Sequence, residues 1–312
     1  MDIRHLELLV AIADEGTFTA AAVRLHIAQP AVSHQIRALE RQLGYPLFQR
    51  TPRGATPTPQ CQALLPSART ALSAMDDARA AARHAGDNQL AGRVRLGAGL
   101  AADRVALTQA VAAHARQHPR VDVAVVRGGS RHLMDLLAER QLDLAVLAAP
   151  TDRISKGVQA RWLQPVEVVC VAPLTHPLAG VGSARLETVL THTLVSLPDG
   201  SGLRVSLQSA ADAVGTDLRI GYEADDLDLV LDLVAEGLGL ALLPLTAAHR
   251  RPDLAVVTLD GSPLAHHTAV AWPTRPSLGR PAEQLRDRLL AVMTTPTDPG
   301  GDHDPAMTCA SG

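Results

Sequence analysis

A polar stripe near the N-terminus carries the side chains best suited to bind another molecule. Gln29, Ser33 and Arg37 lie four residues apart, one helical turn each, and His34 lies beside them. An amide, a hydroxyl, a guanidinium fork and an imidazole can reach both the phosphates and the base edges of double-stranded DNA. The opposite face is apolar at helical spacing, with Val32, Ile36, Leu39 and Leu43. The pattern predicts a DNA recognition helix over residues 29–43, with Pro30 in its first turn.

The segments around this helix predict a winged helix-turn-helix. Apolar residues at helical spacing over 2–14 and 17–25 predict two preceding helices, the second capped by Thr17. Residues 45–54 are expected to extend and turn as a β-wing. Residues 33–53 contain four arginines and one glutamate, a local charge of +4 − 1 = +3 in a chain of net charge −3. Arg50 and Arg53 of the wing are therefore expected to contact the DNA backbone.

These segments resemble the LysR-type transcriptional regulators. The resemblance is carried by Phe18–Ala22, Leu25-His26, Gln29–Ser33, Ile36–Glu40, Leu43-Gly44, Pro46–Phe48 and Arg50. It is dense over residues 3–66, and the organisation downstream agrees with it to about residue 292. It implies a homodimer or tetramer on an interrupted palindrome in double-stranded DNA, a small-molecule effector without any cofactor, and RNA polymerase as a candidate partner. The predicted DNA-binding residues are Thr17, Gln29, Pro30, Ser33, His34, Arg37, Arg50 and Arg53.

Two positions depart from the family pattern. Ala28 stands where the family often has Ser or Thr as the cap of the recognition helix, and the loss of such a cap costs about 1 kcal/mol. Cys61 stands where the family often has glycine at the start of its linker helix. A buried packing thiol is favoured over a redox sensor at Cys61, because no resolving cysteine is evident.

Residues 58–86 predict one long helix. Apolar residues alternate along it by three and four, at Cys61, Leu64, Ala68, Ala71, Met75, Ala78 and Ala82. A helix with so polar an opposite face could not bury this stripe alone, so a partner helix from a second subunit is expected. The predicted dimerisation residues are Leu64, Ala68, Ala71 and Met75. Because the alanines bury little area, other contacts are expected to help hold the dimer.

Strands and helices alternate from residue 92, which predicts α/β lobes built on parallel sheets. Two lobes with crossovers near residues 163 and 266 resemble periplasmic-binding-protein modules, as the family's effector domain does. The expected fold is therefore mixed: an α-rich winged helix-turn-helix, a long linker helix and a two-lobed α/β effector domain. The predicted bounds are 1–58 for the DNA-binding domain, 59–88 for the linker, 92–294 for the effector domain and 295–312 for a disordered tail. Lobe I takes about 92–163 and 267–294, and lobe II about 164–266.

The cleft between the lobes is the expected effector site. Loops at the carboxyl ends of strands, next to helix N-termini, line such clefts and favour anions. The predicted effector-binding residues are Gly99, Leu100, Ala101, Gly129, Ser130, Pro198, Ser201 and Asp225. Ser130 is equally well explained as a plain helix cap, and Arg127 and Arg204 are candidate cations, although surface arginines are the default. The first loop lacks the Ser or Thr that the family often carries, which favours a larger or more apolar effector over a small carboxylate.

No motif points to an enzyme or a metal site. The chain lacks GxSxG, HExxH, a Walker loop and paired Cys/His spacing. Gly97-Ala98-Gly99 is interpreted as a tight turn, His266-His267 as a solvated crossover, and His303 and Asp304 as part of a solvated tail. The rival hypothesis is a ligand-binding or enzymatic α/β protein with an incidental N-terminal helical module.

The three cysteines are far apart in the sequence, which favours a reducing compartment. The sequence shows no signal peptide and no uncharged apolar segment long enough to span a membrane. We therefore expect a cytoplasmic protein without a membrane segment.

Overall fold

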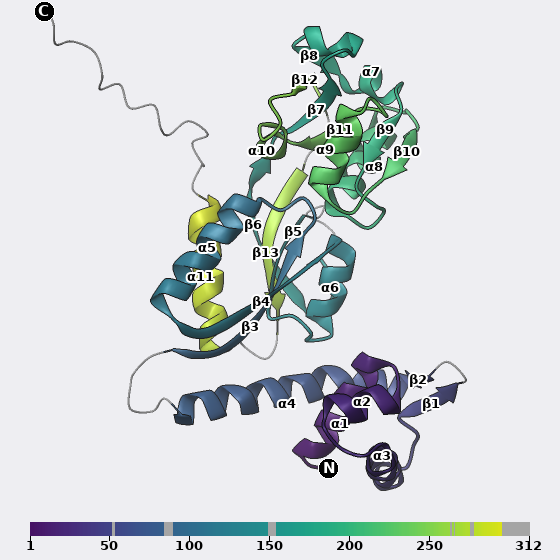
Figure 1. The fold of residues 1–312 in the computed structure, drawn as a ribbon, viewed down its shortest axis with the longest axis vertical. Coiled ribbons are helices and arrows are strands. Elements are labelled where there is room, and N and C mark those ends of the chain that lie inside the picture. Colours follow the sequence, from purple (N-terminus) through teal and green to yellow (C-terminus); the bar gives the residue numbers. More distant parts are fainter. Residues whose placement is uncertain are drawn as a thin grey trace, which may run out of the picture.

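The protein consists of an N-terminal helical domain, a long helix and two α/β lobes arranged in a row (Figure 1). The computed structural model describes residues 1–51, 54–83, 90–148, 154–262, 264, 266–274 and 278–294. Arg53 of the predicted wing and the predicted tail over 295–312 lie outside these residues. Within them, no helix combines the length and apolar character that crossing a membrane requires.

The N-terminal domain is a three-helix unit with a β-hairpin. Its helices are α1 (Ile3–Glu15), α2 (Phe18–Arg24) and α3 (Gln29–Leu43), and its hairpin pairs β1 (Phe48–Thr51) with β2 (Gly54–Pro57). The apolar face of α3 packs inward, as the spacing predicts: Val32, Ile36 and Leu39 are at most 1% exposed. The structure therefore confirms a winged helix-turn-helix arrangement.

Helix α4 (Pro59–Arg83) begins against this domain and then runs beneath lobe I (Figure 1). Its first turns pack into the N-terminal core of the same chain through Cys61, Leu65 and Ala68. The predicted dimerisation stripe is therefore divided. Ala68 is 1% exposed and belongs to the protomer's own core, whereas Ala71 is exposed and Met75 is half-buried. Cys61 and Ala68 face inward, and Leu64 is half-buried against the same core, whereas Ala71 lies exposed on the neighbouring face.

Lobe I contains a five-stranded sheet. Its strand order is β4 (Arg120–Gly128), β3 (Ala91–Gly99), β5 (Leu144–Ala148), β13 (His266–Pro273) and β6 (Val158–Val166). Helices α5 (Arg104–Gln117) and α11 (Arg280–Thr294) cover one face, and α6 (Ser130–Ala138) covers the other (Figure 1). Strands β3, β4 and β5 are parallel, but β13 runs antiparallel to both neighbours. The purely parallel sheet predicted from the alternation is wrong here, because the chain returns from lobe II in the opposite direction.

Lobe II contains a four-stranded sheet and a separate strand pair. The sheet has the order β11 (Ala241–Pro244), β7 (Val168–Pro173), β12 (Leu254–Asp260) and β8 (Ser183–Arg185). The pair joins β10 (Ile220–Glu223) to β9 (Leu194–Ser196), and the helices are α7 (Leu186–Leu190), α8 (Gly202–Ala213), α9 (Leu227–Ala235) and α10 (Leu245–Ala248). Strand β7 is antiparallel to β11 and β12, so this sheet is mixed as well.

The two lobes touch closely at the start of α8. A Cβ atom built on Gly202 would lie 1.9 Å from the carbonyl oxygen of Ala148, at the end of β5 in lobe I. No side chain fits there, so glycine is needed for the backbones of the two lobes to approach. From the other direction, Leu100 and Ala101 of lobe I are buried in the apolar core of lobe II. The two lobes are therefore in direct packing contact, in addition to being connected by the strands that cross between them.

Candidate nucleic-acid interface and effector cleft

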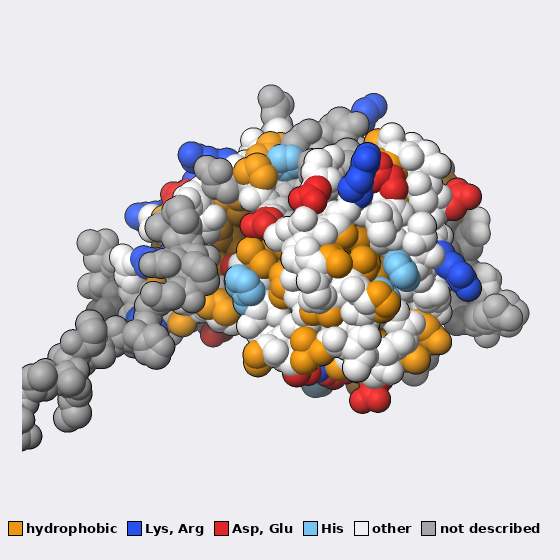
Figure 2. Space-filling model, turned by 90° about the horizontal axis from the view of Figure 1, so that it is seen from above, with side chains coloured by type: hydrophobic (Ala, Val, Ile, Leu, Met, Phe, Trp, Pro, Cys, Tyr) orange, Lys and Arg blue, Asp and Glu red, His pale blue; other side chains and the backbone are white. Residues whose placement is uncertain are grey.

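Helix α3 presents an exposed polar face. Pro30, His34 and Arg37 are exposed, and Gln29 is half-buried. Among the described residues, the guanidinium of Arg37 has no hydrogen-bond or ion-pair partner. Its five donors remain available for a phosphate or for the O6 and N7 atoms of guanine. By contrast, the view onto lobe II shows mostly hydrophobic and uncharged side chains with single charged ones between them (Figure 2).

Ser33 differs from the other members of the predicted stripe. Its side chain is buried, with the residue only 6% exposed, and its Oγ accepts a hydrogen bond of 2.9 Å from Nε2 of Gln29. The hydroxyl therefore fixes the orientation of the Gln29 amide. Geometry assigns Ser33 to positioning Gln29, whereas the sequence pattern alone placed both on a DNA-facing stripe.

Glu40 fixes the wing to the recognition helix, a role that sequence reasoning missed. Its Oε1 accepts hydrogen bonds from the backbone N–H groups of Leu47, at 2.7 Å, and Phe48, at 3.3 Å. A carboxylate on two backbone donors is a charge-assisted contact that holds β1 against α3. The signal in the sequence was an acidic residue amid arginines, which is unusual on a helix that faces DNA.

The other side of the hairpin is fixed to the turn between α1 and α2. The N–H of Ala55 donates to the carbonyl oxygen of Gly16 at 2.7 Å. Gly54 has φ +143°, and a Cβ there would lie 2.4 Å from the same oxygen, so only glycine fits. Arg50 lies in β1 opposite Ala55, which places its backbone in a hairpin held at both edges.

The two helices of the motif are capped differently. Thr17 caps α2, with its Oγ1 accepting from the N–H of Ala20 at 3.0 Å. Ala28 is the cap residue of α3 and makes no side-chain cap hydrogen bond, as its residue type predicts. The N–H groups of Ala31 and Val32 bind the carbonyl oxygen of Ala28, so what the uncapped N-terminus of the recognition helix offers an anion is chiefly its positive dipole end.

Replacing Ala28 by serine is expected to stabilise the N-terminal domain by about 1 kcal/mol, because a hydroxyl would accept a hydrogen bond from the first turn of α3. Urea unfolding followed by helical circular dichroism measures this gain. Ala38→Ser, in the middle of the same helix, is the matched control and should give none. Equal midpoints for the wild type and Ala28→Ser would contradict the assignment of an open cap.

The predicted effector loops meet where the two lobes touch. A Cβ on Gly129 would lie 3.0 Å from the carbonyl oxygen of Gly200, and the N–H of Arg131 donates to that oxygen at 3.3 Å. Ser130 is buried and its Oγ accepts from the N–H of Ala148 at 3.3 Å. Ser201 is buried too and caps α8 by accepting from the N–H of Arg204 at 3.2 Å. Both hydroxyls act as acceptors within the protein, and among the described residues neither donates its proton to a partner.

The remaining predicted effector residues divide into two groups. Gly99, Leu100 and Ala101 are buried, and the last two pack into lobe II. Pro198 is half-buried beside Gly200, whereas Asp225 is exposed. The first loop therefore presents an apolar surface between the lobes, as its sequence suggests.

A pocket of 420 Å³ lies between the lobes, where α5 and α9 begin. Leu100, Ala101 and Leu245 are among its apolar lining residues. Two ion pairs cross from lobe I to lobe II at its mouth: Arg127 to Asp226 at 2.8 Å and Arg104 to Asp228 at 3.0 Å. The hydrogen bond from Arg127 lowers the pKa of the Asp226 carboxyl below its ordinary value. Arg127 is thus paired with Asp226. Asp226 and Asp228 were not predicted from the sequence, in which their only signal is their position at the start of a helix.

His266 is not the solvated crossover residue that the sequence suggested. It is 1% exposed, and its Nδ1 lies 3.4 Å from Oγ of Ser206 on α8. Burial, with the neighbouring His267, lowers the pKa of His266 to about 4. The interpretation was wrong because strand β13 of the lobe I sheet begins at His266, where the ring faces Ser206 on α8 of lobe II.

The two described cysteines are structural thiols. Cys61 and Cys170 are each fully buried, and burial raises the pKa of each thiol to about 12. A thiol held in its protonated form is a poor nucleophile, so neither has the chemistry of a redox sensor. Cys309 lies outside the described residues. Within those residues, no group of three or more His, Cys, Asp or Glu side chains could hold a metal ion.

Comparison with known proteins identifies both halves of the chain. Residues 3–62 match "Bacterial regulatory helix-turn-helix protein, lysR family", and residues 87–294 match "LysR substrate binding domain". The chain is 28% identical to the HTH-type transcriptional regulator BsdA of Bacillus subtilis, over 92% of this chain and 99% of that protein. It is 31% identical to a probable hydrogen peroxide-inducible genes activator of Mycobacterium leprae, over 79% and 78% of the two chains.

A solved structure shows the same fold at full length. Full-length OxyR C199D from Pseudomonas aeruginosa has a TM-score of 0.73 and 24% identity, over 96% of this chain and 99% of that chain. The match of two adjoining family domains excludes an incidental N-terminal module on an unrelated α/β protein. These relatives are named as regulators of transcription, not as enzymes. The chain belongs to the LysR family of bacterial transcriptional regulators.

Proposed function

We propose that this regulator binds an interrupted palindrome as a homodimer or tetramer, with one α3 helix in the major groove at each half-site. The supporting observation is the exposed polar face of α3, on which Arg37 has no partner among the described residues. Because the DNA that it binds lies in the bacterial cytoplasm, the proposal places the protein there. A regulator bound at a promoter lies within reach of RNA polymerase, which we include as a proposed partner.

The predicted DNA-binding residues take different roles in this proposal. Arg37, His34 and Gln29 contact base edges, and Ser33 holds Gln29 in place through their hydrogen bond. The uncapped start of α3, at Ala28 and Pro30, accepts a phosphate at its positive dipole end. Thr17, at the start of α2, and the wing residues Arg50 and Arg53 contact the backbone on either side.

The effector of the proposal binds between the lobes and shifts the population of their arrangements. The buried hydroxyls of Ser130 and Ser201 keep protons for an acceptor group on the ligand. Leu100 and Ala101 supply an apolar wall. These features favour a small molecule with an apolar body and at least one oxygen acceptor. Because Arg127 is paired with Asp226, the proposal does not rely on it as the ligand's cation.

The dimer of the proposal uses the face of α4 on which Ala71 is exposed and Met75 is half-buried, with Leu64 at its edge against the N-terminal core. Ala71→Glu is expected to weaken the dimer at least about tenfold, because it places a charge in an apolar contact between two copies. Ala68→Glu is the matched comparison and should unfold the N-terminal domain, since Ala68 is 1% exposed in that core. Sedimentation and circular dichroism distinguish the two results. A folded, fully dimeric Ala71→Glu protein would show that another surface holds the copies together.

Specific DNA binding is tested by titrating the protein into labelled DNA from upstream of its own gene, with random DNA as competitor, at two salt concentrations. Binding at least about a thousandfold tighter than to random DNA, with a steep salt dependence, is expected. A fragment of residues 90–294 should remain folded and bind neither DNA. Operator binding by that fragment would overturn the assignment of the interface to α3 and the wing.

A further inference from the structure

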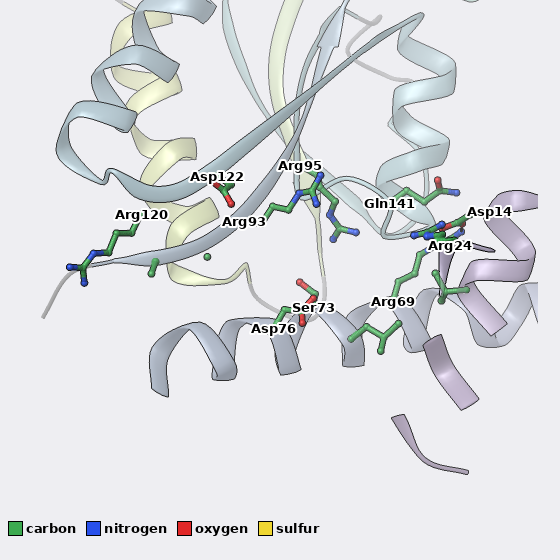
Figure 3. A pocket seen from close by; sticks show the side chains of 14 residues that line it. Asp14, Arg24, Arg69, Ser73, Asp76, Arg93, Arg95, Arg120, Asp122 and Gln141 are labelled. Atoms are coloured by element: carbon green, nitrogen blue, oxygen red, sulfur yellow. Dashed lines mark hydrogen bonds and ion pairs between the residues drawn. The ribbon is translucent and has the colours of Figure 1, made fainter. Parts of the chain in front are cut away.

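Arg69 is a buried arginine where three parts of the molecule meet. It is 6% exposed, and no other arginine, lysine, aspartate or glutamate among the described residues is buried. Its Nη2 donates to Oδ1 of Asp14, in the last turn of α1, at 2.5 Å. Its Nη1 donates to the backbone carbonyl oxygen of Glu139, directly after α6, at 3.2 Å, and lies 3.7 Å from the Glu139 carboxylate. One side chain of the linker helix thus binds the DNA-binding domain with one arm and lobe I with the other. Figure 3 shows Arg69 of α4 beside Asp14.

The rest of this interface is open. A cavity of 580 Å³ separates α4 from strands β3 and β4 beside Arg69. Ser73 and Asp76 line it from α4, and Arg93, Arg95 and Asp122 line it from the strands (Figure 3). A polar, poorly packed interface between domains permits them to move relative to each other. The Arg69 contact therefore fixes the position of lobe I relative to α4, which the poorly packed surface around it does not fix.

Helix α6 connects this contact to the effector cleft. Its N-terminal residues meet lobe II at Gly200, through the close approach of Gly129 and the N–H of Arg131. Its C-terminal cap is Glu139, whose carbonyl oxygen Arg69 binds. Nine helical residues span about 14 Å, and Leu133 and Leu137, each fully buried, pack the helix on the sheet. Movement of lobe II against the N-terminus of α6 therefore displaces the carbonyl group that Arg69 holds.

We propose that Arg69 is the positioning residue through which α6 couples the placement of lobe II to the DNA-binding domain. The proposal rests on the function proposed above and names the contact by which the effector domain reaches the recognition helix. Asp14 completes it on the DNA side, because Arg24 of α2 also binds Asp14, at 3.2 Å. In the structure both halves of the contact are formed, and the proposal is that displacement of α6 breaks the half to Glu139.

Gly129→Ala tests the coupling without knowledge of the effector. The added methyl meets the backbone of Gly200 and pushes lobe II away from the N-terminus of α6. Gly128→Ala, at the preceding residue, serves as its control, because the nearest neighbours of its methyl are side-chain atoms of His132 and Leu133. Each is combined with Arg69→Met, which keeps the stem and removes the guanidinium. Arg79→Met is the control on α4, because the ion-pair partner of Arg79 among the described residues is Asp76 of the same helix. Amide hydrogen exchange of residues 3–15 is measured without DNA.

Gly129→Ala is expected to raise exchange in the last turn of α1 about fivefold when Arg69 is present, and not at all in the Arg69→Met protein. Equal factors in the two backgrounds would overturn the coupling. If Arg69→Met fails to fold by circular dichroism, Arg69→Lys replaces it, because one ammonium group reaches Asp14 or Glu139 but not both. The wild type, Gly129→Ala, Arg69→Met and the double variant of these two are then titrated with the upstream DNA. Absence of specific DNA binding, with exchange still dependent on Arg69, would reject the proposed function and leave the coupling standing.

Discussion

Arg37→Ala is expected to weaken binding to the specific operator by about 1–3 kcal/mol, roughly 5- to 150-fold, while binding to random DNA changes far less. The reason is geometric: Arg37 is exposed in the middle of α3, and its guanidinium has no partner among the described residues. Removal of the side chain therefore leaves no unpaired group inside the protein, and the loss reports on the DNA contact alone. Competition titrations with operator and random DNA measure both effects.

Arg116→Ala is the matched control for this experiment. Arg116 is an exposed arginine on α5 of lobe I, so its removal changes the net charge equally without touching α3. If Arg37 binds a phosphate instead of a base, operator and random DNA lose affinity by the same factor and the salt slope falls by about one. Unchanged affinity for both would remove Arg37 from the interface and contradict the proposed role of α3.

The face of α3 could be predicted from sequence because helical period alone separates its apolar and polar sides. Val32, Ile36 and Leu39 are buried as the spacing requires. Helical periodicity could not reveal that Ser33, at the edge of the polar stripe, is buried, because its burial depends on how the neighbouring helices pack against α3. The clamp by Glu40 was equally hidden, because its partners are backbone N–H groups of a strand that follows the helix.

The linker helix shows how one periodicity can serve two surfaces. Residues at intervals of three and four suggested one continuous dimer stripe, yet Cys61 and Ala68 pack in the chain's own core. Only the position of α1, a long-range contact, decides which residues of the stripe remain for a partner. Arg69 lay beside this stripe as an ordinary helix arginine, and nothing local marked it as buried.

The lobes were predictable as α/β units but not in their strand directions. Strand and helix alternation is a local signal, whereas the antiparallel entry of β13 depends on the chain's excursion through lobe II. Strand β12, over Leu254–Asp260, was missed although its residues are rich in valine and leucine, and β6 was missed because polar residues and Pro165 interrupt its pattern. The predicted cleft loops do meet, but the aspartates that hold the lobes together across the pocket could be found only from their spatial neighbours.

Between pH 7.5 and pH 5, the free energy of unfolding is expected to fall by about 4 kcal/mol because of two buried histidines, about 2 kcal/mol from each. His114, in α5, is 0% exposed, and neither ring nitrogen has a hydrogen-bond partner among the described residues. Burial, with the nearby charges of His118 and Arg288, lowers the pKa of His114 to about 4. Burial, with His267, lowers the pKa of His266 to about 4 as well.

The direction of this effect follows from which state binds the protons. Both imidazoles take up protons near pH 6.5 in the unfolded chain but only near pH 4 in the folded protein. Between these values the unfolded state binds more protons, so acid favours it. The contribution of each neutral imidazole is fully present above pH 6.5, declines through pH 5 and is lost at about pH 4.

Urea unfolding at pH 7.5, 6 and 5 measures the slope, and His114→Leu separates the contribution of one ring. The leucine variant is expected to lose about half of the pH dependence while staying at least as stable at pH 7.5, because leucine leaves no buried nitrogen without a partner. His249→Gln, at an exposed position after α10, should keep the full slope. A wild-type stability that does not change over this range would show that both rings are reached by water. Such a result would contradict the packing of α5 against α11 and of β13 against α8.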